Sequence, residues 1–480
     1  MKLLKKWLVV MMDEYRVVID QSTSGTKCLL VKIDAGIEVV ERLDCKHQQI
    51  YPQEAWVEHD PMEIVDNVYR LLDELIDRYP GQITSISITN QRETIVAWHK
   101  STGEPLANAL VWQCIRSQQI CEQLISAGYE ATIRAKTGLK IDSYFSGPKL
   151  RWLFENNDEY KLAMQAGDLA VGTMDAWLIW NLTGGRVFAT EPSNASRTLL
   201  FDIHRLAWDQ ELMELFRVTP EMLPIVLQSA DDFGDYRGIP IISVMADSQA
   251  ALFGQQCLDN GEIKATLGTG CSVMMQLGTG DAPNSNTMMT TIAWQQCGRA
   301  NYALEGIIRS CGDTLIWAQE NLQLFDSPEL ATQLAFELDD SNGVFFIPAQ
   351  LGLAAPFWRP GAQAAVIGMT RSTTNAHVIR AVFDSIVYQI KAVIDEMEQL
   401  SSASITKVRL DGGVTKNQQL MQYLSSVLNR VVAVSETEEL SALGALAIPG
   451  AFSINNKYTL YTPERIQTNY HQWKGYADMF

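Results

Sequence analysis

The 480-residue chain lacks several features that mark common classes of protein. Its eight cysteines include no pair spaced as CxxC, which argues against both a zinc site and a disulfide framework. No apolar run is long enough to cross a bilayer. Lysine and arginine number 38 against 56 acidic residues, and the net charge of −18 would repel the phosphates of a nucleic acid. We therefore expect a cytoplasmic protein with reduced thiols and neither a membrane nor a nucleic-acid partner.

Three further patterns are missing. No GxxxxGK[ST] motif occurs, so the chain has no Walker-type phosphate loop. The first residues, MKLLKKWLVVMM, place lysines before an apolar run as a signal peptide does, but the run is short and no small-residue cleavage site follows it. We interpret Met1 to Met12 as a dispensable extension. Because no low-complexity linker divides the chain, a domain boundary has to be inferred from internal repetition.

What is present is an ordinary globular composition, with 47% hydrophobic and 20% charged residues. A chain of this length exceeds what one hydrophobic core usually supports, so we expect two domains. A helix is predicted from Pro61, with Asp60 as its N-cap and Glu63 as the capping-box partner. A second, long helix is predicted over 376–400 from apolar residues at helical spacing.

The two halves of the chain repeat one arrangement of strands. In the first half, strands predicted at 15–20 and 28–33 flank a turn rich in serine and threonine. In the second half, strands predicted at 262–267 and 272–277 flank Gly268-Thr269-Gly270. This repetition predicts two related α/β domains, residues 12–253 and 254–460, with small ligands bound in the cleft between them.

The turn from Asp20 to Lys27 has the composition of an anion site. Serine, threonine and glycine in a tight turn can direct several N–H and hydroxyl groups to one point. Asp20 could hold a magnesium ion, and Lys27 could neutralise a phosphate. An ordinary hairpin explains the same residues about equally well.

Two glycine turns could receive a nucleotide, although both could also be plain structural turns. Gly268-Thr269-Gly270 suits the close approach of a phosphate. Asp411-Gly412-Gly413 lies between a predicted strand and a predicted helix, where glycine would let a flat base or a ribose approach the backbone.

Charged residues at two strand ends are candidates for chemistry. Arg92-Glu93 follows the strand predicted at 83–89 and could grip two hydroxyl groups, one as donor and one as acceptor, although a surface ion pair is the commoner explanation. Asp247 lies where a strand passes into an apolar helix. It could cap that helix or act as a general base, and the two roles are compatible.

Several longer segments carry a family resemblance that extends from Tyr15 to the helix after Asp411. They are ITNQRET at 88–94, VWQC at 111–114, YFSG at 144–147, NASRT at 194–198 and YALEG at 302–306. In this order they resemble the FGGY carbohydrate kinases, and among these most closely the glycerol kinases. The resemblance implies two ribonuclease-H-like domains of the actin/hexokinase type that close over the substrates, and ATP-dependent phosphorylation of a small polyol or sugar.

The resemblance also implies roles for individual residues. Asp247 would be the catalytic base, and Arg92, Glu93 and Tyr144 would hold the polyol. Asp20 would lie near Mg²⁺. The residues implied to contact the nucleotide are Thr23, Ser24, Lys27, Thr269, Gly312, Gly413 and Asn417.

The chain departs from the glycerol-kinase pattern on the acceptor side. Ser248 stands where these kinases have Gln, and Ser272 stands where they have a Phe that forms an apolar wall with the tryptophan matched by Trp112. Lys27 replaces an arginine, which keeps the charge but loses the forked geometry. The two serines predict a wider pocket, so a four- or five-carbon polyol or ketose is an alternative acceptor. A contact of this size is worth about 1–3 kcal/mol.

A second hypothesis is a non-catalytic sensor of sugar or nucleotide built on the same fold. Such a protein is expected to lose its base or its metal carboxylate, but Asp20 and Asp247 are both present. The kinase is therefore the favoured interpretation. A homo-oligomer is compatible with it.

Overall fold

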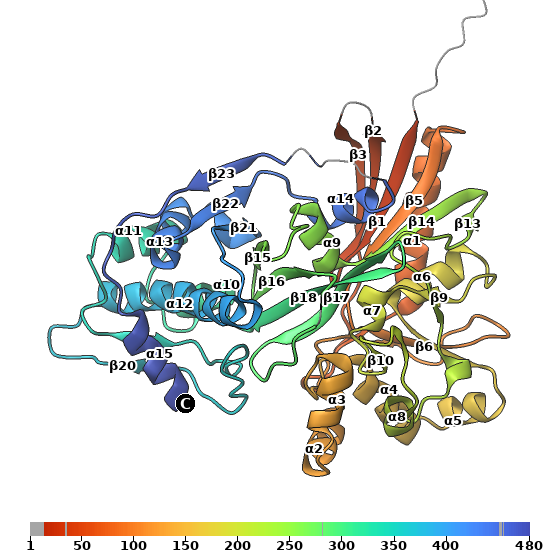
Figure 1. Cartoon of the computed structure of the whole chain (residues 1–480), viewed down its shortest axis with the longest axis horizontal. Helices are drawn as coiled ribbons and strands as arrows, with labels where there is room; N and C mark the ends of the chain where they lie inside the picture. Colours follow the sequence, from red (N-terminus) through yellow and green to blue (C-terminus); the bar gives the residue numbers. More distant parts are fainter. Residues whose placement is uncertain (1–13, 34–35, 281, 451–453, 455) are drawn as a thin grey trace, which may run out of the picture.

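The computed structural model describes residues 14–33, 36–280, 282–450, 454 and 456–480. The proposed extension Met1 to Met12 lies outside these residues. Two large sheets occupy the two halves of the molecule (Figure 1). No helix among the described residues has the length and apolar character needed to span a membrane.

The first sheet has six strands in the order β13-β14-β5-β1-β2-β3. Their bounds are β1 Tyr15–Gln21, β2 Gly25–Ile33, β3 Ile37–Lys46, β5 Ile83–Asn90, β13 Asp235–Tyr236 and β14 Ile239–Ala246. The strands β1, β2 and β3 form an antiparallel meander, while β5 and β14 run parallel to β1. The carboxyl ends of β1, β5 and β14 therefore lie at one edge of the sheet.

The second sheet has seven strands in the order β17-β18-β16-β15-β21-β22-β23. Their bounds are β15 Ile263–Leu267, β16 Cys271–Gly278, β17 Met289–Gln296, β18 Arg299–Ile308, β21 Lys407–Asp411, β22 Val431–Ser435 and β23 Tyr458–Tyr461. Its strands β15, β16 and β18 are antiparallel neighbours, and β21 and β22 run parallel to β15. Both sheets thus contain the same five-stranded unit of three antiparallel strands and two parallel ones, to which β13, β17 and β23 add outer strands, and the predicted repetition of one α/β arrangement is confirmed.

The predicted helices form with small changes at their ends. Helix α1 spans Pro61–Arg78, and the Asp60 carboxylate accepts hydrogen bonds from the Met62 and Glu63 amides, so the N-cap prediction is confirmed. The carboxylate of Glu63 instead accepts from the amide of Gln48, so its predicted capping-box role is wrong.

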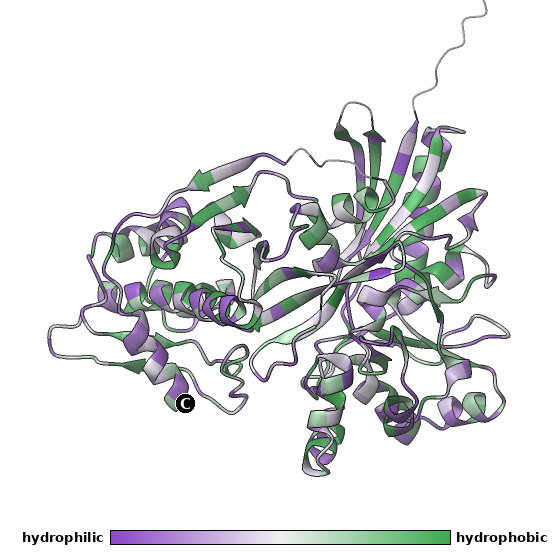
Figure 2. Ribbon diagram, in the orientation of Figure 1, coloured by the Kyte–Doolittle hydropathy of each residue, from purple (hydrophilic) through white to green (hydrophobic). Residues whose placement is uncertain are grey.

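The long helix predicted over 376–400 is α12, Asn375–Ser401. Buried apolar residues lie along it, and Figure 2 shows hydrophobic and hydrophilic segments alternating along this helix. Residues 379–390 are buried without interruption, so the middle of α12 is enclosed: one side packs on the core of the second sheet and another, with Val382, packs on Phe346.

The first hairpin is tighter than the sequence predicts. Strand β1 runs to Gln21 and β2 begins at Gly25, so only residues 22–24 form the turn and Lys27 lies in β2 directly opposite Asp20. Gly25 permits this because a Cβ there would lie 2.6 Å from the carbonyl oxygen of Cys45 in β3. Because β3 lies so close, residues 25–27 pair with it as part of β2, although the sequence predicts them as part of the turn.

Two short helices cross where the halves of the molecule meet. They are α9, Asp247–Gly254, and α14, Leu440–Ala447. A Cβ on Gly444 would lie 1.8 Å from the Ala250 carbonyl oxygen, and one on Gly254 would lie 2.1 Å from that of Leu440. The helices therefore touch backbone to backbone, and α14 also packs against β1 and β2 of the first sheet.

Candidate active site

Asp247 lies at the edge of the first sheet, where β14 ends and α9 begins. Its side chain is 35% exposed. Oδ1 accepts a hydrogen bond from the Ser248 amide at 2.6 Å and lies 3.4 Å from Nε of Arg92. The N-cap of α9 is Ala246 and no side chain caps the helix, so the capping role considered for Asp247 is wrong. Its carboxylate is accessible and bonds only the adjacent amide, which leaves the role of general base open.

Arg92 and Glu93 follow β5 and are nearly inaccessible to solvent, with 6% and 1% of their surface exposed. They are not a surface ion pair, because their closest charged atoms are 4.0 Å apart and each has a better partner. Glu93 has φ of +61°, a left-handed conformation that is uncommon for a residue with a side chain. Such strain often marks a functional site.

The better partners are two charged residues that the sequence reasoning missed. Nε of Arg197 lies 2.6 Å from Oε1 of Glu93, and Glu305 lies between Arg92 and Arg197. Both missed residues belong to segments already noted, NASRT and YALEG. The available signal was a charged residue in an otherwise small or apolar run, because a buried charge usually has a partner elsewhere in the fold.

Trp112 and Tyr144 form one aromatic pair, with ring centroids 5.3 Å apart and planes at 57°. Nε1 of Trp112 donates a hydrogen bond to Oγ1 of Thr23 at 3.0 Å, which joins this pair to the β1–β2 turn. Burial raises the pKa of the Tyr144 phenol above its ordinary value, so the group stays a hydrogen-bond donor. The structure therefore brings together three residues that the sequence assigned to the acceptor and the phosphates.

A buried lysine supports the backbone at Tyr144. Lys149 donates hydrogen bonds to the carbonyl oxygens of Ser143, Tyr144 and Phe145. Burial lowers the pKa of its ammonium group to about 8. Each of the three N–H groups of the Lys149 ammonium can thus donate to one carbonyl oxygen, which fixes the backbone around Tyr144.

Asp20 and Lys27 face each other across the first hairpin, with Nζ of Lys27 3.9 Å from Oδ2 of Asp20. Burial raises the pKa of Asp20 to about 6; Lys27 opposes this shift, while Asp247 and Glu439 add to it. Asp20 near the end of β1 and Asp247 just after β14 flank the end of β5, so the two carboxylates lie at the same edge of the first sheet. Of the other turn residues, Thr23 is partly exposed and Ser24 is exposed.

Three segments meet at the proposed nucleotide side. The amide of Gly312, the first residue of α10 (Gly312–Glu320), donates to the carbonyl oxygen of Gly268 at 3.0 Å, and a Cβ on Gly312 would lie 2.6 Å from that oxygen. Gly412 has φ of +100°, and a Cβ there would lie 2.3 Å from the carbonyl oxygen of Leu267. By contrast, a Cβ on Gly413 would meet open space. The two glycine turns identified in the sequence, 268–270 and 411–413, therefore lie next to each other and next to the start of α10.

The remaining candidates occupy less distinctive positions. Asn417 is the N-cap of α13 (Gln418–Leu428), and its amide group donates to Oγ1 of Thr332 at 2.8 Å. Thr269 is exposed, and its carbonyl oxygen accepts from the amides that open α10. Ser248 is partly exposed next to Asp247, and Ser272 on β16 donates from Oγ to Glu305 at 3.2 Å.

Metal-binding side chains are sparse. Among the described residues no group of three or more His, Cys, Asp or Glu side chains could hold a metal ion. Magnesium usually keeps several waters and takes one or two carboxylates together with substrate phosphates. Asp20 matches that kind of site.

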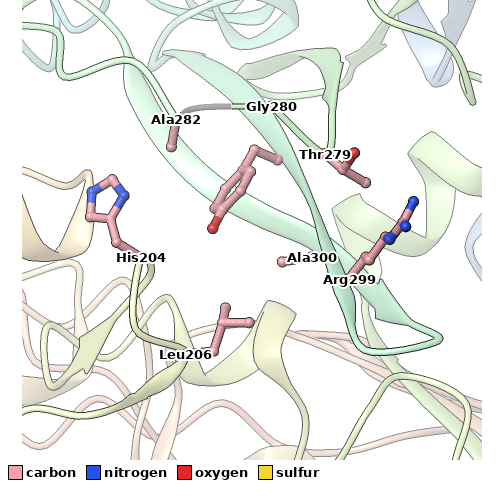
Figure 3. A pocket seen from close by; sticks show the side chains of 8 residues that line it. His204, Leu206, Thr279, Gly280, Ala282, Arg299 and Ala300 are labelled. Carbon is pink, nitrogen blue, oxygen red and sulfur yellow. The ribbon is translucent and has the colours of Figure 1, made fainter.

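A cavity of about 420 Å³ lies elsewhere between the two halves (Figure 3). His204 and Leu206 form one wall, and Thr279 and Arg299 lie across from them. None of the predicted site residues lines it. We therefore do not assign it to the acceptor.

Comparisons with known proteins agree with this arrangement. The models of the N-terminal and C-terminal domains of the FGGY family of carbohydrate kinases match residues 15–254 and 263–452. The chain is 44% identical over 453 residues to "Glycerol kinase 1" of Thermotoga maritima, covering 92% of each chain. It is 42% identical to the glycerol kinase of Symbiobacterium thermophilum, covering 91% of this chain and 89% of that one.

Solved structures share the whole fold. Plasmodium falciparum glycerol kinase with ADP matches at a TM-score of 0.89 and 33% identity, with 97% of both chains covered. The xylulose kinase of Lactobacillus acidophilus matches at a TM-score of 0.85 and 20% identity, with 97% of this chain and 96% of that one covered, and supports the fold alone. The predicted pair of actin/hexokinase-type domains is thereby confirmed. The chain belongs to the FGGY family of carbohydrate kinases.

Proposed function

We propose that this kinase transfers the terminal phosphoryl group of Mg·ATP to a hydroxyl group of glycerol. The observation that carries the proposal is the position of Asp247, an accessible carboxylate beside Arg92 at the same edge of the first sheet as the Asp20–Lys27 hairpin. Relatives named glycerol kinase, 40–44% identical over about nine-tenths of the chain, support glycerol as the acceptor.

In this proposal Asp247 takes the proton of the attacking hydroxyl. Its Oδ1 accepts from the Ser248 amide and lies 3.4 Å from Arg92, whereas Oδ2 forms no hydrogen bond or ion pair with any described residue. Oδ2 therefore receives the proton as the oxygen of the alcohol attacks the phosphorus atom in line. A base in this position typically accelerates reaction by about 10²–10⁴-fold.

The acceptor is held by groups around this carboxylate. Arg92 offers guanidinium donors and Glu93 a carboxylate acceptor to two neighbouring hydroxyl groups. The rings of Trp112 and Tyr144 form the apolar wall against the carbon chain. Ser248 and Ser272 complete the acceptor side with small hydroxyl residues.

The nucleotide is assigned to the opposite side. Lys27 carries the positive charge for the terminal phosphate, and Thr23 and Ser24 offer amide and hydroxyl groups. The open space above Gly413 and the exposure of Thr269 fit the approach of a nucleotide to the backbone, with Gly312 and Asn417 close by. Asp20 would hold Mg²⁺, which neutralises phosphate charge when bound.

We further assign the acceptor side to residues 12–253 and the nucleotide side to 254–460. Closure of these two domains would exclude water and limit wasteful hydrolysis of ATP. We place the activity in the cytoplasm, because eight unpaired cysteines suit a reducing compartment.

A coupled ADP-release assay tests the proposal. The purified protein is assayed with Mg·ATP and glycerol, erythritol, erythrulose, pentitols, xylulose and ribulose. We expect glycerol to give the highest kcat/KM. The four- or five-carbon alternative is not favoured by the relatives, and a preference for one of those acceptors would overturn the assignment to glycerol.

A further inference from the structure

A carboxylate from the second sheet reaches the acceptor side of the site. Glu305 lies on β18 and is fully buried. Its Oε1 accepts hydrogen bonds from Nη1 of Arg92 at 2.8 Å and from Oγ of Ser272 at 3.2 Å, and its Oε2 lies 2.6 Å from Nη1 of Arg197. Burial acts to raise the pKa of Glu305, but Arg197 and Arg92 outweigh it and hold the pKa at about 2. Glu305 is therefore a carboxylate at physiological pH.

The charges around Glu305 are unevenly paired. Two guanidinium groups, those of Arg92 and Arg197, face three carboxylates, those of Glu93, Asp247 and Glu305, and the buried Lys264 ammonium adds positive charge near Glu305 without an ion pair to any of the three. Glu93 is paired with Arg197, and Glu305 is in contact with both arginines. Only Asp247 is left with a long contact, 3.4 Å from Arg92. The carboxylate assigned as the base is thus the least neutralised member of the cluster.

The position of the Arg92 guanidinium group determines which of these carboxylates it neutralises. Its Nη1 is held by Glu305, and its Nε points toward Asp247 without reaching ordinary hydrogen-bond distance. Opposite charges attract strongly where water is excluded. If the charge of Glu305 were removed, the guanidinium group would close on Asp247. That contact would occupy the base and turn the donors of Arg92 away from the acceptor.

The residues of the cluster come from both halves of the chain. Arg92 follows β5 and Arg197 follows α7 (Pro192–Ala195), whereas Glu305 and Ser272 lie on neighbouring strands of the second sheet. Resting on the proposed phosphorylation of glycerol, we propose that Glu305 is a positioning residue that holds Arg92 off Asp247. The acceptor site is then complete only when the second sheet lies against the loop after β5.

Ser272 strengthens the hold on Glu305. Its hydroxyl is a second donor to the same oxygen that accepts from Arg92. A phenylalanine at this position, as in the pattern of the glycerol kinases, could not make this bond. The serine therefore has a polar function in this chain in addition to its small size.

The test compares steady-state kinetics of Glu305→Gln with those of the wild type. Glutamine keeps the shape and loses the charge, so we expect the KM for glycerol to rise at least tenfold and kcat to fall about tenfold. The Kd for Mg·ADP, measured by calorimetry, should stay within twofold of the wild-type value. Glu305→Asp, which restores the charge, should recover part of the loss.

Asp384→Asn is the matched control. Asp384 is also a buried carboxylate, paired with Arg380 at 2.9 Å on α12, but it contacts none of the site residues. We expect it to lower Tm and leave both KM values unchanged. If Glu305→Gln does not accumulate as folded protein, Ser272→Ala replaces it, with an expected rise of about threefold in the KM for glycerol alone.

The outcomes separate the two proposals. A wild-type protein that does not phosphorylate glycerol overturns the proposed function. An active wild type whose glycerol KM is unchanged in both Glu305→Gln and Ser272→Ala overturns the role of Glu305 alone. A loss in Glu305→Gln that affects glycerol and nucleotide equally, and that Asp384→Asn reproduces, also overturns it.

Discussion

Glu439, the residue before α14, places Oε2 2.9 Å from Nζ of Lys27 on the first hairpin. Its other oxygen lies 2.9 Å from Nη1 of Arg42 on β3. The lysine assigned to the terminal phosphate is thus already paired with a carboxylate from the far end of the chain. A nucleotide that approaches this hairpin has to compete with Glu439 for the ammonium group.

Removal of this competitor should tighten nucleotide binding. In Glu439→Gln the charge of Lys27 is released toward the phosphates, and we expect the Kd for a non-hydrolysable ATP analogue, which carries the terminal phosphate, to fall about two- to fivefold, because a partly exposed ion pair contributes about 1 kcal/mol or less. Calorimetry at low salt measures it. Glu438→Gln removes an exposed charge from the preceding residue and should have little effect. Equal shifts in both variants would indicate a general charge effect instead.

Asp247→Asn tests the base. The amide keeps the shape of the side chain but cannot accept the proton, so we expect kcat to fall by about 10²–10⁴-fold. Binding of Mg·ADP should be retained, because the contacts assigned to the nucleotide lie elsewhere. A variant with near-normal turnover would remove Asp247 as the base.

The binding of Mg²⁺ with nucleotide should depend on pH through Asp20. Its pKa is raised to about 6, chiefly by burial and further by Asp247 and Glu439, against Lys27 and Arg42. Below pH 6 the group is protonated and neutral, so we expect affinity for Mg·ADP to fall as the pH decreases from 7 to 5. Calorimetry across this range measures the loss.

Asp20→Asn controls for ionisation of the nucleotide itself, which affects both proteins equally. The variant should bind Mg·ADP weakly, with a flatter dependence on pH. Identical pH profiles for the two proteins would contradict the assignment. Folding stability should depend on pH in the opposite direction to Mg·ADP affinity. The raised pKa of Asp20 stabilises the folded state fully below the unfolded pKa of about 3.8, and this stabilisation is lost as the pH rises through 6.

The crossing of α9 and α14 should tolerate no side chain. In Gly444→Ala the new methyl group would lie 1.8 Å from the Ala250 carbonyl oxygen, so the helices must separate. We expect a loss of about 2–3 kcal/mol in the free energy of unfolding. Urea denaturation measures it. Gly475→Ala on α15 (Tyr470–Met479), where a Cβ meets open space, should stabilise the protein by about 0.5–1 kcal/mol.

The sequence predicts the architecture well because both halves carry local signals. The helix from Pro61 has a cap and an apolar face, and the strands before the two turns are short, almost continuously buried runs. The same signals miss the extent of the first hairpin, since the packing of Gly25 against Cys45 is a contact between strands. The partner of Glu63 was also missed, because Gln48 reaches it from an earlier loop.

The site was predicted unevenly for a similar reason. Asp247, Arg92 and Glu93 stand at strand ends, where position along the chain already implies a place at the sheet edge. The position of their partners along the chain does not imply where those partners lie in the fold. Glu305 is 213 residues from Arg92 along the chain, and Glu439 is 412 residues from Lys27. Pairings of this kind depend on how the halves are assembled, which no local pattern encodes.

The backbone contact between α9 and α14 has a consequence for the spacing of the two reactants. Asp247 opens one of these helices and Glu439 precedes the other, so main-chain atoms set the distance between the backbone at the proposed base and the backbone at the partner of Lys27. Side chains on the outer faces of both helices can then be exchanged without altering that distance. Gly254 and Gly444 keep this distance short, because neither has a side chain at the contact.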